Sequence, residues 1–367
     1  MTPETLKPPL LTEGNKWKKI SQEIDKLDPI QIDRLIPFIH KLNREKNVQA
    51  LTEILYKHLP YPERLERFTY NESIACMRDI GIFLGSLKKH GTEPVEVIPE
   101  LDYVLDVLSD KTNLPPRDTL FHYTIWNPSG LRVRTYTGLS DEIHLIESVK
   151  MSMFPLVDAI YNLVELHQTP LNTPAFEELC NLAEENLSGM INGIVYAKRN
   201  VSPEVFANEL RFYFDPISLY RREFIGPGAV EMPLFVFDHL LWSSESIDEE
   251  YVKFKITYLP FNQPDIRDIY YNYDNQPSLA TKAIEALKKN PTYCPQTAKS
   301  TRALLSLCNR LKSFRMPHKK LAEESYAQQK ERSHGSGGYS TDILSHIISL
   351  NLKTISDIEQ AITRYGR

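Results

Sequence analysis

A single histidine near the end of the chain lies on an apolar helical stripe. Leu307, Leu311 and Phe314 recur at helical intervals, and His318 takes the next position on the same face. A neutral imidazole held in an apolar wall is the kind of ligand that a haem iron accepts. A histidine packed in a protein core would show the same spacing, so the pattern alone leaves both interpretations open.

A proline interrupts the same helical pattern one residue before His318. Pro317 has no N–H, so it frees the carbonyl of Ser313 and kinks the helix. We hypothesise that this carbonyl, or water, accepts the Nδ1 proton of His318 and fixes its tautomer. Arg315, one turn before the histidine, has the chemistry to pair with a haem propionate.

A glycine-rich turn follows this helix and precedes another apolar helical segment. Backbone N–H groups at Gly335 and Gly337, together with the hydroxyl of Ser336, offer hydrogen-bond donors to an anion. The carboxylate of an amino-acid substrate would fit such a turn. The lysine and the spacing of a P-loop are missing, and a flexible linker has the same composition.

An aromatic residue and an arginine form a third candidate set. Ser202 and Pro203 are typical of a helix start, and Phe206 and Arg211 follow within the helix that they open. An aromatic wall beside a guanidinium can hold an aromatic amino acid with its carboxylate, or steer bound oxygen. The alternative interpretation is a core phenylalanine and a surface arginine.

Other catalytic chemistries have no matching pattern in the sequence. There is no Gly-x-Ser-x-Gly elbow, no His-Glu-x-x-His helix and no cysteine–histidine zinc spacing. Asp238 and His239 adjoin inside an apolar segment, which is more typical of a structural pair than of a catalytic one.

Composition indicates a globular protein. The 367 residues are 41% hydrophobic and 25% charged, and the formal net charge of −5 argues against nucleic acid as a partner. The longest apolar stretch, 232–242, is too short to span a membrane, and the first residues lack a signal-peptide pattern. We therefore expect a cytoplasmic protein with no membrane partner. The four cysteines are far apart and are expected to be reduced thiols: Cys76, Cys180, Cys294 and Cys308.

The pattern of elements predicts an all-α fold with two parts. Residues 1–60 are expected to form a tail and a small helical cap, and residues 61–367 the catalytic domain. One helix is expected over 73–90, where Gly81 and Gly85 favour close packing of another backbone or of a flat ligand. Further helices are expected over 140–167, 173–197, 229–242, 277–289, 296–330 and 341–350, with an extended stretch over 122–126 and an irregular connector over 253–274.

Ordered sequence blocks resemble the haem-dependent superfamily of indoleamine and tryptophan 2,3-dioxygenases, and most closely its monodechloroaminopyrrolnitrin synthase branch. The resemblance covers residues from about 70 to 355. Its blocks are Met77-Arg78-Asp79-Ile80-Gly81, Asn113-Leu114-Pro115-Pro116-Arg117, Trp126-Asn127-Pro128, Tyr136-Thr137-Gly138-Leu139, the run from Gly226 to Phe235, Pro317-His318 and Gly335-Ser336-Gly337-Gly338-Tyr339.

The resemblance assigns roles to the candidate residues. It implies that His318 is the proximal ligand of the iron of haem b and that Arg315 meets a propionate. It implies that Phe206 and Arg211 are the distal aromatic residue and arginine. It further implies that Tyr326 and Ser336, flanked by Gly335 and Gly337, hold the amino-acid end of the substrate.

The resemblance also implies a fold and a reaction. We expect a helical bundle that encloses haem, with molecular oxygen as co-substrate, an external electron donor, and L-tryptophan or 7-chloro-L-tryptophan as substrate. The indole would be rearranged to an aminophenylpyrrole with loss of the carboxyl carbon. Three alternatives stay open: indole 2,3-dioxygenation, hydroxylation of an aromatic amino acid, and a non-catalytic haem sensor. The sequence determines neither the oligomeric state nor whether the substrate is chlorinated.

Overall fold

The computed structural model describes residues 13–289, 294–328 and 342–366. In this part of the chain the fold is helical apart from one short hairpin. Strand β1 (Ile217–Leu219) pairs antiparallel with β2 (Arg222–Phe224). The predicted all-α class is therefore confirmed.

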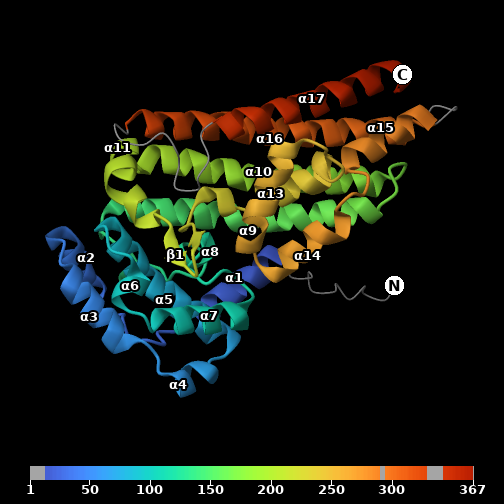
Figure 1. Ribbon diagram of the computed structural model, residues 1–367. Coiled ribbons are helices and arrows are strands. Elements are labelled where there is room, and N and C mark those ends of the chain that lie inside the picture. Colours follow the sequence, from blue (N-terminus) through green and yellow to red (C-terminus); the bar gives the residue numbers. More distant parts are fainter. Residues whose placement is uncertain (1–12, 290–293, 329–341, 367) are drawn as a thin grey trace, which may run out of the picture.

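Four long helices run side by side through the upper half of the molecule (Figure 1). In the order of their packing they are α9 (Ser140–Gln168), α10 (Pro174–Asn200), α16 (Pro295–Ala327) and α17 (Asp342–Tyr365). Their starts and the expected ones agree to within a few residues, because a strong helical period in the apolar residues marks each of them. The last helix, expected to end at 350, continues to Tyr365. The shorter α15 (Leu279–Lys289) packs against α16 and α17.

The lower half is built from shorter helices around α5 (Tyr70–Lys89) (Figure 1). Thr69 and Glu72 form a capping box at its start. One hydrophobic cluster joins α5 to the helices before and after it. These are α2 (Ile36–Glu45), α3 (Val48–His58), α4 (Pro62–Glu66), α6 (Pro94–Val97) and α7 (Leu101–Thr112); α1 (Glu13–Ile24) packs on α9 and α5 instead. The division at residue 60 stays a prediction.

The two glycines of α5 serve close packing. A Cβ atom on Gly81 would lie 2.5 Å from Cγ of Asp118. One on Gly85 would lie 2.5 Å from the carbonyl oxygen of Tyr213 and 2.7 Å from the hydroxyl of Tyr136. At both positions the missing side chain leaves room for another part of the protein. This confirms that the two glycines serve helix packing and not the binding of a flat ligand.

Three of the segments predicted from the sequence have another form in the structure. Residues expected to be extended form α8 (Leu120–Tyr123) and a turn. The expected irregular connector is wrong, because it contains α13 (Glu249–Tyr258), capped by Asp248, and α14 (Pro264–Tyr273), with proline in its first turn. The single helix expected over 229–242 is broken into η4 (Ala229–Glu231), α12 (Leu234–Asp238) and η5 (His239–Ser243). Tyrosine, proline and aromatic content masked the helical period in these segments.

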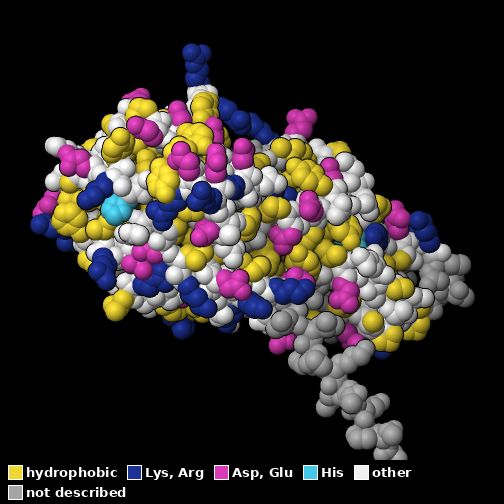
Figure 2. Space-filling model, turned by 90° about the horizontal axis from the view of Figure 1, so that it is seen from below, with side chains coloured by type: hydrophobic (Ala, Val, Ile, Leu, Met, Phe, Trp, Pro, Cys, Tyr) yellow, Lys and Arg dark blue, Asp and Glu magenta, His cyan; other side chains and the backbone are white. Residues whose placement is uncertain are grey.

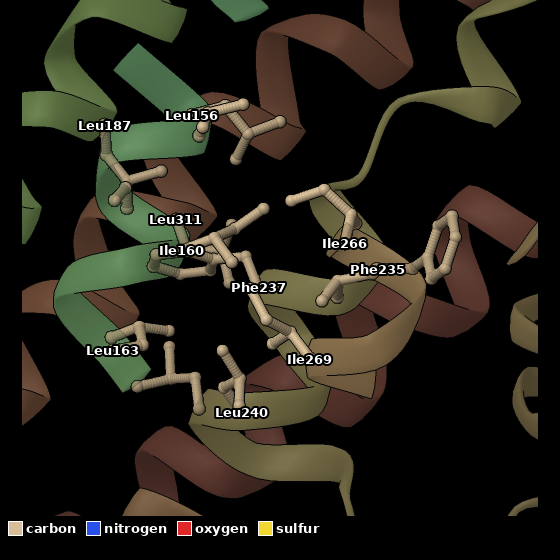
Figure 3. Packing of buried hydrophobic residues seen from close by; sticks show 14 of the residues in the cluster. Leu156, Ile160, Leu163, Leu187, Phe235, Phe237, Leu240, Ile266, Ile269 and Leu311 are labelled. Atoms are coloured by element: carbon tan, nitrogen blue, oxygen red, sulfur yellow. The ribbon is translucent and has the colours of Figure 1, made fainter. Parts of the chain in front are cut away.

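A hydrophobic core fixes the helix that carries His318. Leu311 of α16 packs among Ile160 of α9, Phe237 of α12 and Leu240 of η5 (Figure 3). Because Leu311 and Phe314 are both buried, the stripe predicted from the sequence faces this core. His318 is thereby placed at the edge of the packed interior.

Acidic and basic side chains alternate over the face seen in Figure 2. No broad basic area appears on this face, in keeping with the net charge of −5. None of the described helices combines the length and the apolar character that a membrane span requires.

Candidate functional site

A cavity of about 320 Å³ lies where the upper helices meet the middle of the chain. Four of the residues singled out in the sequence line it: Phe206, Arg211, Arg315 and His318. Two come from the segment after α10 and two from α16, more than a hundred positions later. The structure thus brings together side chains that sequence spacing alone could not relate.

His318 faces this cavity from α16. Its ring is half-buried and stacks on Phe314, with ring centroids 5.6 Å apart and planes at 24°. Burial, together with the positive charge of Arg315, lowers the pKa of His318 to about 4. The imidazole is therefore neutral at physiological pH, the form in which it donates a lone pair to a metal.

The expected partner of the His318 ring is not seen. Pro317 does lie inside α16, as predicted, but the ring makes no hydrogen bond to the Ser313 carbonyl or to another described residue. The Ser313 carbonyl is therefore not supported as the acceptor, and water as the acceptor stays a prediction. Ala322 and Ser325 continue the same face and also line the cavity.

Arg315 is held by a buried carboxylate. Its Nη2 donates to Asp238, whose side chain is fully buried and lines the cavity. The same carboxylate accepts hydrogen bonds from the hydroxyl of Tyr251 and, at 3.0 Å, from Nε1 of Trp242. The buried Nε of Arg315 has no hydrogen-bond partner among the described residues. That N–H group is available to an anion placed in the cavity.

Phe206 and Arg211 are positioned by an irregular helical segment. The hydroxyl of Ser202 accepts the N–H of Val205, as the predicted cap requires. The chain then passes through a π-helical stretch, η2 (Phe206–Leu210), and a 3₁₀ stretch, η3 (Arg211–Phe214). The single continuous helix expected here is therefore wrong. A π-helical turn adds one residue to the turn, which sets both side chains toward the cavity.

The opposite walls come from elements of different types. The loop at Pro227–Val230, within a sequence block noted above, runs along the cavity. Ser148 and Ser152 of α9 face Gly193 of α10, and Ile343 and Ile347 of α17 line another side. Most of these residues are apolar. The hydroxyl groups of Ser148 and Ser152 donate hydrogen bonds to backbone carbonyl oxygens of α9. The cavity therefore favours a largely apolar ligand with a few fixed polar contacts.

Some candidate residues cannot be placed, and others were missed. Gly335, Ser336 and Gly337 lie outside the described residues, as does the side chain of Tyr326, although its backbone belongs to α16. Asp238 and Tyr251 were not expected at the cavity. Asp238 had been interpreted with its neighbour as a structural pair, and no local signal marks Tyr251, which comes from the segment expected to be irregular.

A family model described as "Monodechloroaminopyrrolnitrin synthase PrnB" matches residues 17–366. The chain belongs to this family. Monodechloroaminopyrrolnitrin synthases are enzymes of pyrrolnitrin biosynthesis, and they are haem-dependent. The match extends through the cavity-lining segments and confirms the resemblance to the monodechloroaminopyrrolnitrin synthase family.

The cavity residues fit the haem of the monodechloroaminopyrrolnitrin synthase family. A porphyrin supplies four ligands to its iron, so the protein needs to add only one neutral imidazole, and His318 is such a group. The unpartnered Nε–H of Arg315 suits a propionate. Apolar walls around both groups match the macrocycle.

Proposed function

We propose that this protein is a haem-dependent enzyme that acts on L-tryptophan or 7-chloro-L-tryptophan. The indole ring would be rearranged to an aminophenylpyrrole, and the carboxyl carbon would be lost. Molecular oxygen would be the co-substrate. The observation that carries the proposal is the convergence of His318, Arg315, Phe206 and Arg211 on one apolar cavity.

Each of these side chains has a distinct task in the proposed reaction. His318 would hold haem through the iron, and Arg315, kept in place by Asp238, would bind a propionate. The haem supplies binding and activation of oxygen when it is bound. Phe206 would pack on the indole, while the guanidinium of Arg211 would orient a charged or polar group beside it. The apolar walls would keep water away from the reacting ring.

The amino-acid end of the substrate would be held by the segment that follows α16. We assign this task to Tyr326 and Ser336, with backbone N–H groups at Gly335 and Gly337. These donors suit a carboxylate, because backbone N–H groups ahead of a helix bind anions. Placing the carboxylate there would leave the indole in the apolar part of the cavity.

The test is product analysis with reduced, haem-loaded enzyme, oxygen, and either tryptophan or 7-chlorotryptophan. Mass spectrometry should detect an indole-derived product that has lost the carboxyl carbon, and an isotope pattern would show whether chlorine is retained. Phe206→Leu should lower turnover, whereas Phe38→Leu, a change at an exposed phenylalanine, serves as the matched control.

The alternatives give different products. Absorbance of N-formylkynurenine would indicate indole 2,3-dioxygenation, and a product heavier by one oxygen atom would indicate hydroxylation. A Soret shift on addition of tryptophan without any consumption would indicate a haem sensor. Any of these three results would contradict the proposed rearrangement.

A further inference from the structure

A second cleft of about 830 Å³ lies on the outside of the molecule. Strand β2, the end of α7 and the segment from α13 to α14 form its walls. We call it the outer cleft. Its volume is within the range of small-molecule sites.

The outer cleft carries three cations in an acidic protein. Arg222, Lys253 and Arg267 line it, and none of them forms an ion pair with a carboxylate of the described residues. Nη2 of Arg267 is fixed by the carbonyl oxygen of Asn113 at 2.8 Å. Asp110 and Glu223 also line the cleft, so cations outnumber carboxylates. Guanidinium groups without a carboxylate partner favour a phosphate-like anion.

Aromatic side chains line the same cleft. Tyr258 and Phe261 are buried in its wall, with ring centroids 6.4 Å apart. Phe224 is half-buried and has Arg222 over its ring at 5.5 Å. Ser109 and Thr257 also line the cleft, and their hydroxyl groups donate to the carbonyl oxygens of Leu114 and Lys253. The cleft therefore offers contacts to a flat ring, to hydroxyl groups and to an anion.

The rim of the outer cleft is held by a strained turn. Tyr220 and Arg221, which join β1 to β2, both have positive φ values, of 51° and 62°. Such a turn ordinarily carries asparagine and glycine, so side chains here cost conformational energy. The hydroxyl of Tyr220 donates to Asp106 of α7 at 2.6 Å, which ties the hairpin to the other wall.

One aromatic contact separates the outer cleft from the candidate haem cavity. Phe254 lines the cavity, Tyr258 lines the outer cleft, and their ring centroids lie 4.9 Å apart. Both side chains come from one face of α13. Because electron transfer through protein weakens steeply with distance, a redox partner in the outer cleft would be well placed to reduce a group in the cavity.

We propose that the outer cleft binds reduced flavin mononucleotide, the electron donor that the proposed function requires. The phosphate meets Arg222, Lys253 and Arg267, the ribityl chain meets the hydroxyl groups, and the flavin ring packs on the half-buried Phe224. The reduced flavin gives up two electrons and two protons. Each electron would reduce the ferric iron of one haem-loaded enzyme molecule to ferrous iron, so one flavin would serve two enzyme molecules in succession, and the protons would pass to solvent.

Binding is tested with oxidised flavin mononucleotide on haem-free protein, by quenching of flavin fluorescence. Saturable quenching is expected for the natural chain. Reversing two charges, with Lys253→Glu and Arg222→Glu, should weaken binding by roughly tenfold or more. The matched control reverses two exposed charges elsewhere, with Lys57→Glu and Lys353→Glu, and should leave the dissociation constant unchanged. Riboflavin, which lacks the phosphate, should bind at least as weakly as flavin mononucleotide binds to the double variant.

Equal binding of flavin mononucleotide to the cleft variant and to the control variant would overturn the proposal. So would equal binding of riboflavin and flavin mononucleotide. On haem-loaded protein, reduction of iron by reduced flavin mononucleotide should be slow in the cleft variant, while reduction by dithionite is unchanged. If dithionite-reduced enzyme forms no product from tryptophan, the proposed function fails, whereas flavin binding is judged by the fluorescence measurement alone.

Discussion

Asp238 shows how one buried side chain can order several others. It receives hydrogen bonds from Tyr251, Trp242 and Arg315, and these donors come from three separate elements. Arg315 lies on the same helix as His318, one turn before it. The carboxylate therefore fixes the imidazole indirectly, by holding the helical turn that precedes it.

Replacing Asp238 with asparagine should destabilise the fold strongly. The substitution leaves the buried Arg315 guanidinium without its counter-charge, a loss of about 3–5 kcal/mol in the free energy of unfolding. Urea denaturation measures it. The control is Glu184→Gln, which breaks the pair between Glu184 and the more exposed Arg310 on the same helix and should cost about 1 kcal/mol or less. Equal losses in the two variants would contradict this role for Asp238.

Only some of the residues that line the candidate site could be predicted from the sequence. The apolar period that includes Leu311 and Phe314 predicted which face of α16 carries His318. Nothing in the local sequence marks Asp238 or Tyr251, because their importance depends on contacts between distant segments. Periodicity describes one element at a time and contains no information about such contacts.

At the scale of the elements, two π-helical segments set the direction of side chains that line the cavity. η2 carries Phe206 and leads into Arg211, and η5 directly follows Asp238. Each π turn holds one residue more than an α-helical turn would, which changes the direction of the side chains that follow. Sequence patterns predicted continuous helices in both places, because a single extra residue hardly alters the apolar period.

Deleting the exposed Asn208 from η2 should separate the two cavity residues. Removal of one residue restores an α-helical turn and rotates Arg211 by about 100° relative to Phe206. We expect the natural chain, loaded with haem, to show a Soret change on addition of tryptophan, and the deletion variant to fold and bind haem without that change. Asn208→Ala keeps the residue count and should retain that change. Normal tryptophan binding by the deletion variant would argue against the importance of the π turn.

Lys255 is fully buried and donates hydrogen bonds to the π-helical segment η5. Its Nζ donates to the carbonyl oxygen of Ser243 at 2.7 Å and to Nδ1 of His239 at 3.2 Å. Burial lowers the pKa of Lys255 from 10.5 to about 8. Between these two pH values the unfolded chain binds a proton that the folded chain does not bind. Folding stability should therefore rise with pH across this window.

The variant Lys255→Met should lack this rise. Comparing the pH dependence of the free energy of unfolding for the natural chain and the variant isolates the contribution of Lys255. The difference between them should change by on the order of 3 kcal/mol from pH 8 to 10.5. Lys353→Met, at an exposed lysine, should leave the pH dependence unaltered. A natural chain whose pH profile matched that of the Lys255→Met variant would refute the assignment.

At the scale of the whole molecule, the sequence predicted the helical class and the long helices. The strongest helical periods of apolar residues, such as that of α9, arise because one face of the helix is buried. Such a period is expected for a packed helix in any helical fold. The segments with α8, α13 and α14 were predicted poorly, because aromatic residues and prolines there obscured the period. The closeness of the outer cleft to the cavity had no sequence signal, since it depends on how α13 packs between them.

The central claim is that His318 binds the iron of a haem held in the cavity. The most direct measurement is the absorption spectrum of the protein reconstituted with haem, compared with that of His318→Ala before and after addition of imidazole. We predict a Soret band for the natural chain, its loss or marked shift in the variant, and its restoration by imidazole. A variant with the same spectrum as the natural chain, or a natural chain that retains no haem, would contradict the account.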